Sequence, residues 1–167
     1  MTPFRLGHDE FQHELPWLLM RNGPVTKYWQ CDVFEQDIEE MLARHFDVRR
    51  FDCAQWHSED DMHAALKVGL VLPAYTGSGF DALADSLTDI EVPQATGVLV
   101  ALDNFSEAHR GDLLLKVLAS ASRWWLLFGR VFCVVLRTDD PRYEGPRVGG
   151  ARPMWNGREW LDAKRGL

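Results

Sequence analysis

The sequence predicts an α/β domain with a largely parallel sheet of about four strands, packed by helices. Two short and nearly continuous apolar runs, residues 97–102 and 131–137, are typical of strands that are buried on both faces. Between these runs, residues 106–125 carry apolar side chains at helical spacing. Because strands alternate with helices along the chain, we expect parallel pairing and a layered fold.

The first half of the chain continues this alternation. Residues 25–29 are rich in β-branched and aromatic side chains and follow an Asn-Gly-Pro turn, so they predict a strand. Residues 33–45 predict a helix that Asp32 could cap, and residues 48–53 predict a second strand. Ser58 is placed to cap a further helix, because it precedes a run with apolar residues on one face.

One domain with two additions accounts for the length of the chain. We expect residues 48–137 to form the central domain and residues 1–47 to add an N-terminal strand and helix, with the strand at an edge of the sheet. Residues 138–167 contain many prolines and glycines and read as an irregular tail. Trp155 and Trp160 are expected to pin this tail to the body.

Composition and charge exclude several classes of protein. With 46% hydrophobic residues the 167-residue chain can form a core, which argues against disorder or a disulfide scaffold. The net charge of −7 argues against direct binding to nucleic acid and favours a basic protein partner. The seven tryptophans are expected in the core rather than on a base-stacking surface.

The chain carries no targeting signal that we recognise. Its start lacks a basic segment followed by a long apolar run, and its longest apolar runs are far shorter than the roughly 20 residues of a membrane span. Cys31, Cys53 and Cys133 show no metal-type spacing, so we expect buried thiols in a reducing cytoplasm.

The acidity is concentrated in one stretch. Residues 58–91 contain seven acidic residues and one basic residue. After a glycine-rich loop, Ser78 could cap a helix on which Asp81, Asp85 and Asp89 follow one another at intervals of four. Three carboxylates on one helix face repel each other by roughly 0.2–0.5 kcal/mol per adjacent pair, which favours a functional role over a merely solvated face.

The same stretch resembles the signature of the barstar family, inhibitors of barnase-like secreted ribonucleases. The resemblance covers about residues 48–137, extending back to Asp61-Met62-His63 and more loosely forward to the strand near 131–136. Its most specific part is Leu72-Pro73-x-Tyr75-x-Gly77 followed by Asp81-Ala82-Leu83-x-Asp85-x-Leu87-Thr88.

The resemblance implies a barstar-like layered fold and a surface that plugs a ribonuclease active site. Asp85 matches the carboxylate that enters the phosphate site, Asp81 flanks it, and Tyr75 packs on the enzyme rim. The implied partner-binding residues are Tyr75, Thr76, Gly77, Gly79, Phe80, Asp81, Ala84, Asp85 and Asp89. Four of these depart from the family pattern, namely Thr76, Gly79, Phe80 and Ala84.

The resulting hypothesis is a cytoplasmic immunity protein, monomeric and without metal or cofactor, that inhibits a basic secreted ribonuclease or similar toxin in a 1:1 complex. The alternative is a protein-binding module on the same fold whose partner is not a ribonuclease, motivated by the departures from the family pattern. The third hypothesis is an enzyme that uses Cys53 and His57. The spacing of these two residues along the chain matches no zinc-binding pattern. We therefore predict that the protein is not an enzyme.

Overall fold

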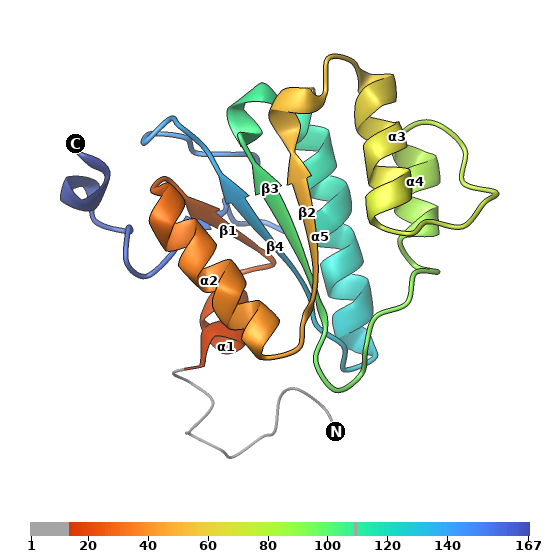
Figure 1. Ribbon diagram of the computed structural model, residues 1–167, viewed down its shortest axis with the longest axis horizontal. Helices are drawn as coiled ribbons and strands as arrows, with labels where there is room; N and C mark the ends of the chain where they lie inside the picture. Colours follow the sequence, from red (N-terminus) through yellow and green to blue (C-terminus); the bar gives the residue numbers. More distant parts are fainter. Residues whose placement is uncertain (1–13, 109) are drawn as a thin grey trace.

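The computed structural model describes residues 14–108 and 110–167 (Figure 1). The strands are β1 (Val25–Tyr28), β2 (Asp47–Asp52), β3 (Val98–Asp103), β4 (Phe132–Arg137) and β5 (Met154–Trp155). The α-helices are α1 (Leu15–Met20), α2 (Cys31–Ala43), α3 (Glu59–Gly69), α4 (Phe80–Ser86) and α5 (Gly111–Leu127). The first 13 residues of the predicted N-terminal extension lie outside the described residues.

The five strands form one sheet in the order β2-β3-β4-β1-β5, and every pair is parallel. The predicted α/β class and parallel sheet are confirmed. The four predicted strands are all present within one or two residues of their expected bounds. The fifth strand, β5, was not expected, because it lies in the segment that we predicted to be irregular.

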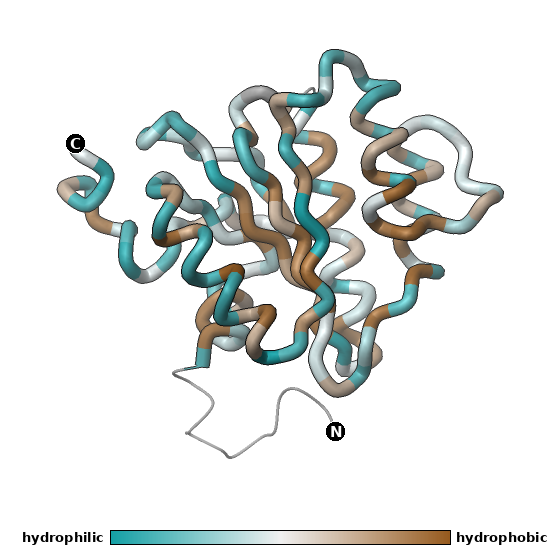
Figure 2. The backbone as a smooth tube through the Cα atoms, in the orientation of Figure 1, coloured by the Kyte–Doolittle hydropathy of each residue, from teal (hydrophilic) through white to brown (hydrophobic). Residues whose placement is uncertain are grey.

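Helices cover both faces of the sheet, and β3 and β4 lie at its centre (Figures 1 and 2). Alternate residues of these strands point to opposite faces: Leu99 and Val135 pack with α1 and α2, whereas Val100 and Val134 pack with α3, α4 and α5. Because both faces are covered, the two strands are apolar at almost every position, which Figure 2 shows as brown central strands.

The expectation that the N-terminal extension adds an edge strand is wrong. β1 lies between β4 and β5, because the C-terminal tail returns to pair along its free side. Thr26 is in register with Met154, and Lys27 is in register with Trp155. The backbone N–H of Asn156 donates to the carbonyl of Lys27 at 3.0 Å, and its side-chain amide donates to the same oxygen at 3.1 Å. The tail therefore protects what would otherwise be an open sheet edge.

Two buried charged side chains hold the tail in place. Glu159 is 0% exposed, and its carboxylate accepts the backbone N–H groups of Trp29 at 3.1 Å and Gln30 at 2.7 Å. Arg165 is also buried and donates to the carbonyl oxygens of Pro141 at 2.9 Å and Trp160 at 3.0 Å. These bonds join the last residues of the chain to the turn between β1 and α2 and to the loop after β4.

One of the two tryptophans expected to pin the tail does so. The ring of Trp155 interacts with two cations, with Lys27 Nζ and the Arg165 guanidinium each 4.5 Å from its centroid. The prediction for Trp160 is wrong, because this side chain is 63% exposed.

Several helix boundaries differ from the predicted ones. The Ser58 cap is confirmed, since its hydroxyl accepts the N–H of Asp61 at 3.1 Å. The cap position of α2 is Gln30 rather than Asp32, and Asp32 lies in the first helical turn. α5 begins at Gly111 instead of residue 106, because a short 3-10 turn and a left-handed Arg110, with φ of 50°, interrupt the helical path. α1 was not predicted.

The cysteines are free, as expected, but they do not share one environment. Cys53 and Cys133 are buried, and burial raises the pKa of Cys133 to about 12. Cys31 is exposed, which corrects the expectation of three buried thiols; it opens α2 on the solvent side. Within residues 14–108 and 110–167, none of the helices combines the length and the hydrophobicity that a membrane span requires.

The buried Lys27 ammonium predicts an unusual dependence of stability on pH. Burial, and then the charges of Arg165 and Arg152, lower the pKa of Lys27 to about 8. Below pH 8 the folded and the unfolded chain both carry this proton, so the full cost of burying the charge is present. Between about pH 8 and 10.5 only the unfolded chain keeps it, so the contribution of Lys27 to the free energy of unfolding should rise with pH.

Urea denaturation of the wild type and of Lys27→Met at pH 7.0 and 9.5 measures this effect. The wild type should gain stability relative to the variant at the higher pH, because the variant has no ammonium group to neutralise. Unfolded tyrosines and the unfolded Cys53 and Cys133 thiols lose protons in this pH range and oppose the gain, because burial raises the pKa values of Tyr28 and of both thiols in the folded state. Both proteins share this opposing effect, so the difference between them isolates Lys27. An identical pH dependence in both proteins would contradict the prediction.

Candidate functional site

Residues 70–79 form a loop between α3 and α4 that projects from the side of the molecule (Figure 1). The Lys67 ammonium group on α3 holds this loop, because it donates to the carbonyl oxygens of Ala74 at 3.3 Å and Thr76 at 3.0 Å. The backbone N–H of Thr76 also donates to the carbonyl of Pro73 at 3.0 Å. These bonds restrict the loop before any partner is bound.

α4 begins directly after Gly79, which adopts a φ of 100° and a ψ of 165°, a region that glycine alone visits easily. The carbonyl of Gly79 accepts the first helical bond, from the N–H of Leu83 at 3.0 Å. The predicted cap by Ser78 is wrong, since Gly79 takes the N-cap position and no side chain of the described residues caps this end of the helix. Asp81 lies in the first turn, where the helix dipole favours a carboxylate.

Asp81 and Asp85 lie one turn apart on α4, and both side chains are exposed. In the part of the chain that the structure describes, neither carboxylate takes part in a hydrogen bond or ion pair. Their charges are therefore not neutralised by the protein's own cations. A cationic surface could bind both without first breaking an internal contact.

The third aspartate does not lie on the helix, so the predicted stripe over three turns is wrong. α4 ends at Ser86, because Thr88 turns back and bonds the carbonyl of Asp85 through both its N–H at 3.1 Å and its hydroxyl at 2.7 Å. Asp89 is exposed, and its carboxylate accepts the hydroxyl of Tyr75 at 2.5 Å. This hydrogen bond raises the pKa of Tyr75 and ties the loop to the segment after α4.

Thr76 and the small residues of the predicted surface differ in how they are placed. The Thr76 side chain is buried, and its hydroxyl lies 2.7 Å from that of Ser86. It therefore fixes the loop against α4 and does not face solvent. Gly77 is exposed in the loop, and Ala84 on α4 is half-buried.

Phe80 joins the start of α4 to its neighbours. Its half-buried ring packs edge-on against His63 of α3, with ring centroids 5.1 Å apart. The guanidinium of Arg110 lies 5.3 Å from the same ring and also forms an ion pair with Glu59 at 3.1 Å. Phe80 thus sets the position of α4 and leaves only part of its ring for a partner.

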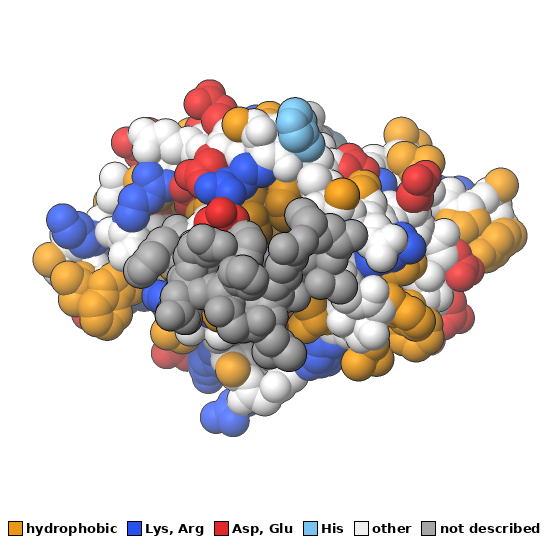
Figure 3. Space-filling model, turned by 90° about the horizontal axis from the view of Figure 1, so that it is seen from below, with side chains coloured by type: hydrophobic (Ala, Val, Ile, Leu, Met, Phe, Trp, Pro, Cys, Tyr) orange, Lys and Arg blue, Asp and Glu red, His pale blue; other side chains and the backbone are white. Residues whose placement is uncertain are grey.

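An exposed apolar surface at the end of α5, which sequence reasoning missed, lies close to the end of α4. It consists of Trp124, Leu127 and Phe128, here called the aromatic end of α5, and Leu127 is 80% exposed. The indole N–H of Trp125 donates to the carbonyl of Leu87 at 3.0 Å, which joins the two helix ends. Figure 3, viewed from below, shows hydrophobic side chains at the surface on this side of the molecule.

The expectation that all tryptophans pack in the core is therefore wrong for Trp124, as it is for Trp160. The last turn of α5 is apolar at every position from Trp124 to Phe128, and only one side of a helix can face the core. A run of this kind at a helix end was the signal that could have indicated an exposed surface.

The residues considered for catalysis do not form a reactive group. Cys53 is buried, which raises the pKa of its thiol, while the nearby His57 is exposed. Among the described residues, no group of three or more His, Cys, Asp or Glu side chains is arranged to hold a metal ion.

The backbone conformation of Gly79 predicts that a substitution at this position lowers the free energy of unfolding. Gly79→Ala should reduce the free energy of unfolding by about 1–3 kcal/mol, because alanine is strained at this φ and ψ. Gly77→Ala is the matched control: a Cβ there would meet Ala82 at an ordinary 3.5 Å, so the change should stay within about 0.5 kcal/mol. Urea denaturation measures both, and equal effects would contradict the prediction.

Residues 46–137 match the family model for barstar, described as a barnase inhibitor. The match runs from β2 to β4 and contains the 70–79 loop and α4, whereas α1, β1, α2 and β5 lie outside it. None of the curated proteins compared with the chain matches it.

Proposed function

The chain belongs to the barstar family, and on this premise we propose that it inhibits a barnase-like ribonuclease by placing α4 and the 70–79 loop in the enzyme's active site. The observation that carries the proposal is the pair of exposed aspartates, Asp81 and Asp85, one turn apart and without an internal cation. A ribonuclease active site must hold cationic side chains that bind RNA phosphates. Carboxylates can take the place of those phosphates and exclude the substrate.

The proposed roles of the site residues follow from where they lie. The Asp85 carboxylate binds among the enzyme's cationic side chains, in the place of an RNA phosphate, and Asp81 flanks it. Asp89 and Tyr75, which are hydrogen-bonded to each other, contact the rim of the active site. The backbones of Gly77 and Gly79, the exposed part of the Phe80 ring and the small side chain of Ala84 permit close approach. Thr76 acts from inside, by fixing the loop.

Preorganisation supports tight binding by this surface. The Lys67 clamp and the contact between Thr76 and Ser86 hold the loop and helix in one arrangement, so little conformational entropy remains to be lost on binding. The net charge of −7, most of it in residues 58–91, would also attract a basic enzyme from a distance. This attraction should weaken as salt is added.

We further propose that residues 48–137 carry this activity, that the protein acts as a monomer in a 1:1 complex without cofactor or catalytic turnover, and that it works in the cytoplasm as an immunity protein. Residues 1–47 and 138–167 then serve to complete the fold around β1. In this proposal they take no part in blocking the enzyme.

Inhibition kinetics test the proposal directly. Cleavage of a fluorogenic RNA by a panel of basic barnase-like ribonucleases is measured at increasing concentrations of the protein. We expect inhibition of at least one enzyme that is competitive with RNA, saturates at one protein per enzyme and weakens between 50 and 500 mM salt. Absence of inhibition across the panel at low salt would count against it.

The aromatic end of α5 favours a second candidate function, a binding module whose partner is not a ribonuclease. Three large apolar side chains beside the end of α4 would suit a partner with an apolar surface next to its cationic patch. A partner that binds through Asp85 yet has no ribonuclease activity would support this candidate over inhibition.

A further inference from the structure

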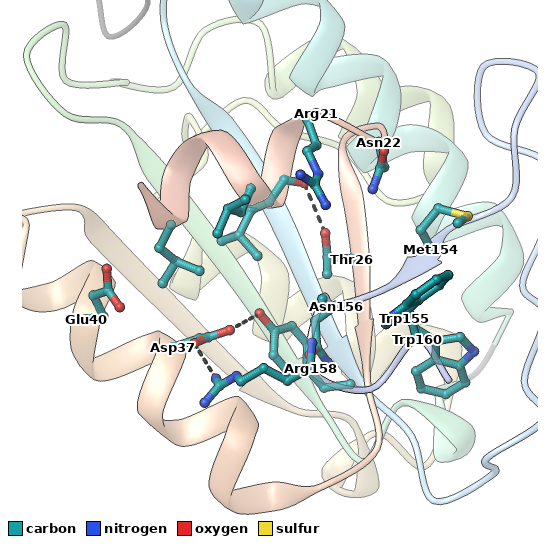
Figure 4. A pocket seen from close by; sticks show the side chains of 15 residues that line it. Arg21, Asn22, Thr26, Asp37, Glu40, Met154, Trp155, Asn156, Arg158 and Trp160 are labelled. Atoms are coloured by element: carbon teal, nitrogen blue, oxygen red, sulfur yellow. Dashed lines mark hydrogen bonds and ion pairs between the residues drawn. The ribbon is translucent and has the colours of Figure 1, made fainter. Parts of the chain in front are cut away.

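A pocket of about 850 Å³ lies on the face of the sheet opposite to α4, outside the segment that matches the family model (Figure 4). Its walls come from α1, β1 and α2 on one side and from residues 154–160 of the tail on the other. A volume of this size is in the range of small-molecule sites, about 300–1,000 Å³. Nothing in the proposed inhibition uses it.

Part of the exposed lining of the pocket is apolar. α1 contributes Leu18, and the tail contributes Met154 and Trp160, and all three side chains are exposed. Leu15 and Leu19 continue this apolar wall inward, where both are buried. Since exposed apolar area is unfavourable in water, a ligand with an apolar body would be stabilised by covering these side chains.

Most polar groups that line the pocket already have partners. The hydroxyl of Tyr28 donates to Asp37 at 2.5 Å, and Arg158 donates to the same carboxylate (Figure 4). The hydroxyl of Thr26 donates to a backbone carbonyl at 3.0 Å, and Glu40 forms an ion pair at 3.0 Å with Arg44, which follows the end of α2. These groups offer little to a ligand.

Arg21 is the exception among the charged lining residues. Within residues 14–108 and 110–167 its guanidinium has no hydrogen bond or ion pair, and neither does the side-chain amide of Asn22 beside it. Both residues lie in the turn between α1 and β1, at the same end of the pocket (Figure 4). One cation and one amide donor suit a single carboxylate. A doubly charged phosphate would need a second free cation, because Asp37 and Glu40 also line the pocket.

We propose that this pocket binds a small amphipathic carboxylate, with its apolar body against α1 and Trp160 and its carboxylate on Arg21 and Asn22. Binding there is separate from ribonuclease inhibition, because α4 lies on the other face of the sheet. The site is formed by the two segments outside the family match, so it is a property of this chain's own extensions.

Isothermal titration calorimetry of the full chain with three probes that share a heptyl tail tests the proposal: octanoate, neutral octanamide and cationic heptyltrimethylammonium. We expect octanoate to bind at one site, on the order of tenfold more tightly than octanamide, and the cation more weakly still. Arg21→Gln should lower the affinity for octanoate to that for octanamide. Arg142→Gln, an exposed arginine that does not line the pocket, should leave it unchanged.

Trp160→Ala locates the binding site, because it should weaken octanoate and octanamide by similar factors. Both Arg21 and Trp160 are exposed, so their variants should fold normally. Three results would overturn the proposal: no saturable binding of octanoate at millimolar concentration, equal binding of the anion and the cation, or octanoate binding that survives both Arg21→Gln and Trp160→Ala.

Discussion

In the proposed complex, replacing Asp85 by asparagine is expected to weaken inhibition of the ribonuclease by about 30-fold or more. Removing one partner of a desolvated, hydrogen-bonded charge pair in an interface costs about 2–5 kcal/mol, since the enzyme's cations remain buried without their counter-charge. Asparagine keeps the shape of the side chain, so the effect isolates the charge. Inhibition constants for the wild type and the variant, measured at the same salt concentration, give the ratio.

Asp32→Asn is the matched control for this substitution. Asp32 is likewise an exposed aspartate on a helix, but it lies on α2, which packs on the opposite face of the sheet. It removes the same charge from the long-range field, so it should slow association slightly and leave the dissociation rate unchanged. Equal losses in the two variants would mean that net charge alone matters, which would contradict a specific role for Asp85.

Asp85→Asn is not expected to destabilise the folded protein, so a loss of inhibition would report on binding. The Asp85 carboxylate has no hydrogen bond or ion pair among the described residues, and its nearest charge on the same helix face is the like charge of Asp81. Asp85→Asn removes a repulsion of roughly 0.2–0.5 kcal/mol, so the variant should be as stable as the wild type or slightly more so. A lower midpoint of thermal unfolding would show instead that Asp85 supports the fold.

The elements that could be predicted from the sequence are those whose pattern is set locally. β3 and β4 are apolar at almost every position because both faces are covered, and this is visible without knowing which helices cover them. α3 is similar, because the Ser58 hydroxyl caps a helix whose apolar face is regular. The parallel topology then follows from the alternation of strands and helices.

The pairing of the tail with the free side of β1 could not be predicted in this way. β5 has only two residues, and its partner β1 lies more than a hundred residues earlier in the chain. Glu159 and Arg165 would be expected at the surface on composition alone, since charged side chains are seldom fully buried. Each is buried here because backbone groups from distant segments satisfy it, and no local pattern reports such an arrangement.

In the candidate site, too, the features set by local sequence could be predicted and those set by distant contacts could not. Spacing along the chain predicted that Asp81 and Asp85 share a helix face, and the resemblance indicated the loop before them. The spacing of the aspartates does not show where α4 ends. The helix stops because the hydroxyl and the N–H of Thr88 both donate to the carbonyl of Asp85 and replace the helical hydrogen bond. The inward direction of Thr76 likewise depends on Ser86, ten residues away.

Glu159→Gln is expected to lower the free energy of unfolding by about 3 kcal/mol, the largest stability effect that we predict. The carboxylate accepts three donors: the N–H groups of Trp29 and Gln30 and the side-chain amide of Asn156. A glutamine amide has one oxygen and presents its own N–H₂ to at least one of these donors. A buried donor without a partner costs about 1–3 kcal/mol, and the charge-assisted bonds are lost in addition.

Glu144→Gln removes the same charge from an exposed position in the same tail and should change stability by less than about 0.5 kcal/mol. For a chain of this length, 3 kcal/mol corresponds to a fall in Tm of about 6–12 °C. Hydrogen exchange locates the loss: the amides of Trp29, Gln30 and Asn156 should exchange faster in Glu159→Gln, while those of β3 should change least below the unfolding transition. Equal Tm values for the two variants would show that Glu159 does not hold the tail on β1, and the closed sheet edge would then need another cause.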